Sequence, residues 1–213
     1  MKKTIKKKYR KCLRYFLNKK NRQRLENKNF TIISSNCIGG VIYNELGLKF
    51  QSPTINIYFK ASDFVKFCKN LKYYLSLDLK PIIQDQLSYP VMKLGDITLY
   101  CVHYKSFEEV IESWDRRKKR VDFDNIFFIM IERDNCTYED IVEFDNLPYK
   151  NKVIFVHKDM PKISSAYHIN GTEVTNDKNH KVKGLMEYEG KFTGKRYIDE
   201  FDYVDFFNHN KEQ

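Results

Sequence analysis

The chain has 213 residues, of which 42% are hydrophobic and 15% aromatic, and this composition excludes disorder over most of its length. No stretch approaches about 18 consecutive apolar residues, so we expect no membrane-spanning segment. The basic amino terminus is not followed by the apolar run of a secretory signal. The five cysteines are widely spaced without a CxxC pair, which predicts free thiols in a reducing cytoplasm and no zinc site.

The net charge of +10 is concentrated at one end of the chain. Residues 1–28 contain 13 of the 38 Lys and Arg residues but only one of the 28 acidic residues. Residues 29–213 therefore carry 25 bases and 27 acids. We predict a cationic arm (1–28) joined to a nearly neutral domain (29–213), with a core at 29–160 and a tail at 161–213.

The arm lacks Pro and Gly, and its apolar residues recur at intervals of three to five, which predicts an amphipathic helix. The apolar stripe consists of Ile5, Tyr9, Cys12, Leu13, Phe16 and Leu17. We expect this stripe to dock on the neighbouring domain. The alternatives are an anionic membrane surface and nucleic acid. Nucleic acid is the least expected partner, because no basic surface with interleaved aromatic residues is evident beyond the arm.

From residue 29 onward, short β-rich runs alternate with helical patterns. The predicted strands are 30–35, 54–59, 97–102, 126–131 and 153–156. Helices are predicted to begin near Ser62, Ser106 and Thr137, the last two with capping-box spacing. The uninterrupted apolar run 126–131 is typical of a central strand that is covered on both faces. This alternation predicts a Rossmann-like α/β fold: a mostly parallel sheet with helices on both faces.

The tail has a different pattern. Apolar residues flank the pair Asn170-Gly171, which predicts a β-hairpin over 167–174. The polar stretch 176–195 is expected to be a loop. A last short helix is predicted around Phe201, Val204, Phe206 and Phe207, where it would cover apolar surface.

Ligands of parallel α/β sheets bind outside the carboxyl ends of the strands, so the residues that follow the predicted strands are the candidate site. They are Asn36, Cys37, Gly39, Gly40, His103, Lys105, Arg133, Asp134 and His157. Cys37 is the sharpest candidate, because a helix amino terminus lowers a thiol pKa and a histidine, His103 or His157, would act as its base. The alternative is a small buried side chain at Cys37.

The remaining candidate groups would hold an anion. Asn36 and the backbone of Gly39 and Gly40 would bind an oxyanion or phosphate, and Arg133 would pair with an anionic ligand. The basic run 114–120 is expected to be a solvated helix end, where cations offset the helix dipole. Its alternative is a diphosphate clamp formed by Arg116, with Trp114 stacked on a sugar. The GxGxxG and P-loop motifs are absent, which argues against common dinucleotide and P-loop sites. No metal site is predicted, and the sequence leaves the cofactor unknown.

Several motifs in fixed order carry a resemblance to a known family. They lie at 35–40, 46–48, 52–54, 63–67, 70–75, 89–90, 103–106, 114–118 and 133–137. Over residues 29–160 the chain resembles a bacterial family of unknown function that is often labelled exopolysaccharide biosynthesis proteins. The resemblance implies a role with cell-surface glycans but no catalytic residue. Ile38 stands where the family pattern has a larger aromatic residue.

Three functions follow as hypotheses. The first is a group transferase of surface-polysaccharide assembly, with Cys37 and His103 at its reacting centre and a sugar nucleotide or lipid-linked sugar as substrate. The second is a non-catalytic module that binds a glycan precursor or a partner protein. The third is nucleic-acid binding through the arm. The expected location is the cytoplasm, at the inner face of the membrane if the arm binds lipid.

Overall fold

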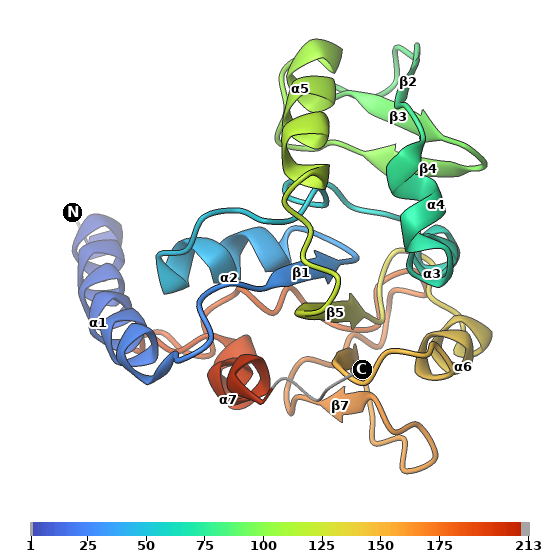
Figure 1. Cartoon of the computed structure of the whole chain (residues 1–213). Coiled ribbons are helices and arrows are strands. Elements are labelled where there is room, and N and C mark those ends of the chain that lie inside the picture. Colours follow the sequence, from blue (N-terminus) through green and yellow to red (C-terminus); the bar gives the residue numbers. More distant parts are fainter. Residues whose placement is uncertain (1, 210–213) are drawn as a thin grey trace.

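A computed structural model describes residues 2–209, with side chains from residue 6 onward (Figure 1). Its helices are α1 (Lys2–Arg24), α2 (Ile38–Leu46), α3 (Ala61–Lys69), α4 (Leu71–Ser76), α5 (Phe107–Lys118), α6 (Tyr138–Asp145), the 3-10 helix η1 (Tyr197–Glu200) and α7 (Tyr203–Asn208). Its strands are β1 (Thr31–Ser34), β2 (Lys80–Ile82), β3 (Val91–Leu94), β4 (Ile97–Tyr100), β5 (Ile126–Ile131), β6 (Lys152–Val156) and β7 (Ala166–His168). Within 2–209, no helix combines the length and apolar character needed to cross a bilayer.

The main sheet has the strand order β1-β5-β6-β7, and every neighbouring pair is parallel. All six residues of β5 are buried, which confirms the predicted central strand. Their side chains alternate between two hydrophobic cores. Phe128 packs with α3, α5 and α6, whereas Phe127 packs with α2 and α7. The predicted α/β class with helices on both faces of a parallel sheet is therefore confirmed for this half of the molecule.

A second sheet makes the fold mixed rather than purely Rossmann-like. Strands β2, β3 and β4 form an antiparallel sheet. The predicted strand at 97–102 is confirmed as β4, but it belongs to this antiparallel sheet and not to the expected mostly parallel one. Burial alternates along β4, as in an antiparallel strand with one covered face. A two-residue turn at Gly95 and Asp96 joins it to β3, and Gly95 has φ 59°, which Gly adopts without steric cost.

Two other predicted elements differ from the structure. The segment 54–59 is not a strand, because only Tyr58 forms a bridge, to Tyr100. The helical pattern beginning near Ser62 is divided by Asn70 into α3 and α4, and the N-cap of α3 is Lys60. By contrast, the caps at Ser106 and Thr137 are confirmed, since each side chain accepts a hydrogen bond from the backbone three residues later.

The tail completes the main sheet and one of its cores. The predicted hairpin over 167–174 is wrong, because β7 pairs in parallel with the exposed edge of β6. Gly171 still forms a turn, with φ 76°, but the backbone that follows it pairs with residues 181–183. The loop at 176–195 and the last helix, α7, are confirmed. Leu185 in that loop and Phe207 in α7 are both buried.

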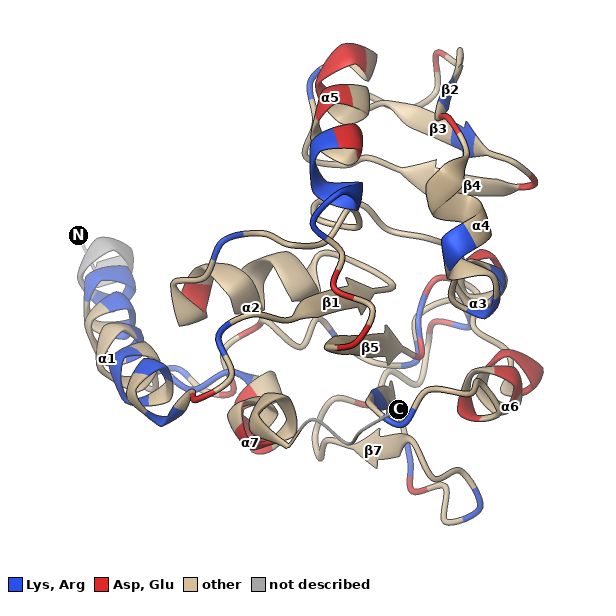
Figure 2. Cartoon of the chain, viewed as in Figure 1, with Lys and Arg blue, Asp and Glu red and all other residues tan. Residues whose placement is uncertain are grey.

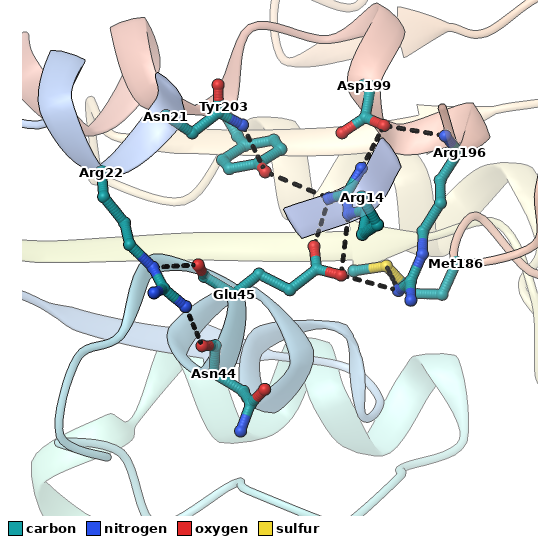
Figure 3. Close-up of polar contacts among 9 residues, drawn as sticks. All are labelled: Arg14, Asn21, Arg22, Asn44, Glu45, Met186, Arg196, Asp199 and Tyr203. Carbon is teal, nitrogen blue, oxygen red and sulfur yellow. Dashed lines mark hydrogen bonds and ion pairs between the residues drawn. The ribbon is translucent and has the colours of Figure 1, made fainter. Parts of the chain in front are cut away.

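The arm forms the predicted helix, α1, and docks on the domain, but through the opposite face. Arg14 is only 4% exposed and pairs with Glu45 of α2 and Asp199 of η1 (Figure 3). Most of the predicted apolar stripe instead faces solvent, with Phe16 61% exposed, whereas Leu13 is half-buried and packs against Gly194 of the tail. The side chain of Ile5 lies outside the described residues. The prediction of an apolar dock is therefore wrong, because complementary charges on α2 and η1 hold the polar side of the helix.

Candidate functional site

The turn between β1 and α2 lies at the carboxyl edge of the main sheet. Cys37 is the N-cap of α2, but its side chain makes no capping hydrogen bond. Asn36 does this instead, because its Oδ1 accepts a hydrogen bond from the backbone N–H of Ile38 at 3.1 Å. Ser34 fixes the turn further by donating from Oγ to the carbonyl oxygen of Asn36 at 2.7 Å. The strand end and the helix start are thus joined by local hydrogen bonds.

Gly39 and Gly40 allow α2 to pack closely against β1 and against the segment that contains Ile55. A Cβ atom on Gly39 would stand 2.7 Å from Oγ of Ser34, and one on Gly40 would stand 3.3 Å from Cγ2 of Ile55. Both glycines are buried. Their missing side chains therefore serve helix packing rather than the approach of a ligand. The two glycines can contribute to a site only through their backbone N–H groups. These lie in the first turn of α2 and have no acceptor within the helix.

A cavity of about 320 Å³ lies beside this turn. It is lined by Asn36, Cys37, Ile38, Val41, Tyr58, Ile131, Arg133, Asp134, Gly184, Leu185 and Met186. Four of the predicted site residues thus meet in one place: Asn36, Cys37, Arg133 and Asp134. They come together because β1 and β5 are parallel neighbours whose carboxyl ends share one edge of the sheet.

The charged wall of the cavity follows β5. Asp134 and Asn135 have φ values of 56° and 65°, in the left-handed region that costs most residues energy. Nη1 of Arg133 donates to the carbonyl oxygen of Val182 at 3.0 Å, and the Asp134 carboxylate lies 3.3 Å from Nε2 of His180. Burial raises the pKa of Asp134, while Arg133 and His180 oppose that shift. The wall therefore presents a cation beside a carboxyl group with a raised proton affinity.

The pKa of the Cys37 thiol is raised, whereas the sequence analysis predicted that it is lowered. Burial raises its pKa to about 11, and the negative charge of Asp134 acts in the same direction. These effects outweigh the helix amino terminus, which favours the thiolate. Cys37 is therefore a neutral thiol near pH 7, and the predicted activated nucleophile is not supported.

Neither predicted histidine base lines the cavity. His103 is exposed in the turn after β4, on the second sheet. His157 follows β6 and is held by Glu132, with 2.6 Å between Nδ1 and Oε2. Glu132 is only 1% exposed, and its Oε1 also accepts a hydrogen bond from Nζ of Lys181 at 3.1 Å. Sequence reasoning missed Glu132. This residue directly follows the buried strand β5, and its contact with Lys181 links the edge of the sheet to the tail.

The predicted clamp on α5 does not form. Trp114 is 1% exposed and packs in the core near Phe67, so it cannot stack on a sugar. Arg116 and Lys105 are exposed and do not line the cavity. The apolar stripe of α5 points Trp114 into the core. This corrects the clamp alternative. The expected solvated helix end is found only for Arg116 and Lys119, because Arg117 is buried and donates to the hydroxyl oxygen of Tyr104 at 2.6 Å.

The structure adds cavity residues that no local pattern indicated. Tyr58 lines the cavity and stacks on Tyr100, with ring centroids 4.5 Å apart. Leu185 and Met186 arrive from the tail, in a segment predicted only as a loop. Their positions depend on long-range packing, so residue spacing carries no signal for them.

Alkylation of Cys37 should be slow near neutral pH and should accelerate as the pH approaches 11. A raised pKa leaves little thiolate at pH 7, and the thiolate is the reactive form. Rates read residue by residue by mass spectrometry should place exposed Cys12 first and Cys37 next. Cys101 should follow, because burial raises its pKa to about 12. A Cys37 rate that equals or exceeds that of Cys12 at pH 7 would contradict the assignment of a neutral thiol.

Comparison with known proteins places the chain in a family. The model of a domain of unknown function, DUF1919, matches residues 8–208. The chain belongs to the DUF1919 family. A protein of Haemophilus influenzae described as "Uncharacterized protein" is 42% identical over 196 residues, covering 92% of each chain. The expectation of a family of unknown function is confirmed, whereas neither description mentions exopolysaccharide biosynthesis. The DUF1919 match also extends beyond 29–160 to most of α1 and to α7.

Proposed function

We propose that the cavity binds a small anionic glycan precursor, such as a sugar phosphate or the sugar end of a sugar nucleotide. The observation that carries this proposal is the convergence of Asn36, Arg133 and Asp134 on one cavity at the carboxyl edge of β1 and β5. Its volume of about 320 Å³ suits a single sugar ring with its attached phosphate, near the lower end of the range of about 300–1,000 Å³ for ligand sites.

The lining offers complementary contacts for such a ligand. Arg133 supplies a guanidinium group, which pairs well with phosphate, and the first turn of α2 favours a negative charge. Asn36 and Asp134 supply oxygen atoms that can accept hydrogen bonds from sugar hydroxyl groups. Tyr58 and Met186 provide apolar surface for the carbon face of the ring. The resemblance read from the sequence, which implies a role with cell-surface glycans, supports the choice of a glycan precursor as the ligand.

Thermal-shift and calorimetric titration with sugar phosphates and nucleoside diphosphate sugars tests the proposal. One class should raise the melting temperature of the wild-type protein. Arg133→Met should weaken its binding by about 10-fold or more, because a hydrogen-bonded charge pair is lost. Arg116→Met removes an exposed arginine outside the cavity and should bind normally. Val41→Trp should block binding by filling the cavity. Failure of every ligand, or unchanged binding by Val41→Trp, would contradict the proposal.

A group transferase is the second candidate, and the raised pKa of Asp134 favours it. A carboxylate with increased proton affinity is suited to remove a proton from an acceptor hydroxyl group as that group attacks the sugar. Asp134→Asn should then retain ligand binding but abolish release of the nucleoside diphosphate in the presence of an acceptor. A binding module would show no such release from the wild-type protein.

A further inference from the structure

We propose that α1 attaches this protein peripherally to an anionic lipid surface through the side that faces away from the domain. We call this side the outer face. It comprises Tyr9, Cys12, Tyr15 and Phe16 with the flanking lysines Lys8, Lys11, Lys19 and Lys20, all of which are exposed. Phe16 and Lys20 lie at its edge, where they also line a groove between α1 and the tail. This inference is independent of the cavity and its ligand.

The opposite side of α1 contacts the domain. Arg14 pairs with Glu45 and Asp199, and Nδ2 of Asn21 donates to the hydroxyl oxygen of Tyr203 at 2.8 Å. The tail also packs tightly here, because a Cβ atom on Gly194 would lie only 2.6 Å from Cβ of Leu13. These contacts hold the helix in one orientation on the domain.

The outer face exposes large aromatic rings. Tyr9, Tyr15 and Phe16 are 49%, 60% and 61% exposed. Together with Leu17, they make up four of the ten large hydrophobic residues that are exposed among the residues the structure describes. Phe192, 74% exposed, lies alongside, with its ring centroid 5.9 Å from Nζ of Lys6. Such a concentration of apolar side chains on one helix marks an interaction surface.

The charge around these rings specifies the occupant. Helix α1 contains twelve Lys and Arg residues and no acidic residue, and Figure 2 shows the basic positions along the described helix. Arg14 and Arg24 are paired with acids of the domain, whereas the outer-face lysines point to solvent. An anionic bilayer satisfies both features, because lysines reach headgroup phosphates while aromatic rings enter the interface. Nucleic acid would satisfy the charges but would not bury the aliphatic and aromatic surface as a continuous face.

Vesicle co-sedimentation of the full-length protein provides the test. Binding is expected to vesicles that contain phosphatidylglycerol, to be much weaker to phosphatidylcholine alone, and to decrease with added salt. Phe16→Ser and the pair Lys19→Glu/Lys20→Glu should each weaken binding by about tenfold or more. The matched controls are Ile83→Ser, at an 80% exposed residue just after β2, and Lys158→Glu/Lys162→Glu, with the same change in net charge. Both controls should bind more tightly than their outer-face counterparts.

A second measurement separates insertion from simple charge attraction. A polarity-sensitive dye on Cys12 should shift to the blue on vesicle addition, whereas the same dye on Ile83→Cys in a Cys12→Ser background should not. Equal losses in the test and control pairs would overturn the proposal. So would binding to duplex DNA but not to vesicles, or a stable dimer in solution that protects Cys12 from labelling.

Discussion

Replacing Arg14 with methionine should lower the free energy of unfolding by about 3–5 kcal/mol, the usual cost of leaving a buried charge unpaired. Glu45, 6% exposed, would lose its paired hydrogen bonds from the guanidinium group, and Asp199 would lose its ion pair. Arg196 would still lie 3.1 Å from Glu45, but it cannot replace both contacts. Urea unfolding followed by circular dichroism measures the change.

Two further variants test the cause of that loss. Lys19→Met removes an exposed cation from the same helix and should change stability by no more than about 0.5 kcal/mol. The combination Arg14→Met/Glu45→Met should be less destabilising than the sum of its single substitutions, because it removes both members of the pair. Strict additivity would show that the two side chains do not stabilise each other.

Replacing Phe207 with alanine should cost about 3–5 kcal/mol, as expected for a fully buried phenylalanine. Its ring stacks on Phe30 with centroids 4.5 Å apart and meets the edge of Phe127 of β5 at 5.1 Å. The cavity left by the substitution would lie directly under the main sheet. Thermal and urea unfolding should both record the loss.

Phe192→Ala is the matched control, since it removes the same side chain from a site that is 74% exposed. Its stability should stay within about 0.5 kcal/mol of the wild type. If Phe207→Ala were equally mild, α7 would be an appendage rather than part of the core. The buried contacts of Phe207 lead us to expect a clear difference.

The central parts of the fold could be predicted because local patterns determine them. The apolar run of β5 and the capping residues Ser106 and Thr137 depend on near neighbours in the chain. The strand that pairs with β4 is not determined by near neighbours, since an apolar strand can join either a parallel or an antiparallel sheet. The turn at Gly95-Asp96 was the available signal for the antiparallel sheet. Likewise, the pairing of β7 with β6 could not be predicted from local sequence, because it depends on which strand lies at the edge of the main sheet.

The site was predictable to the extent that strand order determined it. Asn36 and Arg133 follow adjacent parallel strands, so the rule for sheet edges brought them together. The same rule failed for His103, because β4 belongs to the other sheet. Cys37 shows a different limit: the sequence indicates a helix amino terminus, but only the three-dimensional structure reveals the burial and the nearby Asp134 that raise its pKa.

The Arg14 pairing also affects the order in which the protein assembles during synthesis. Asp199 lies 185 positions after Arg14, so the ribosome adds nearly all of the chain before this partner exists. At about 5–20 residues per second, this interval is on the order of ten seconds or more. During that time the cationic helix has emerged but its partner carboxylate on η1 has not been made, so the helix acquires its full set of contacts only after the end of the chain is synthesised.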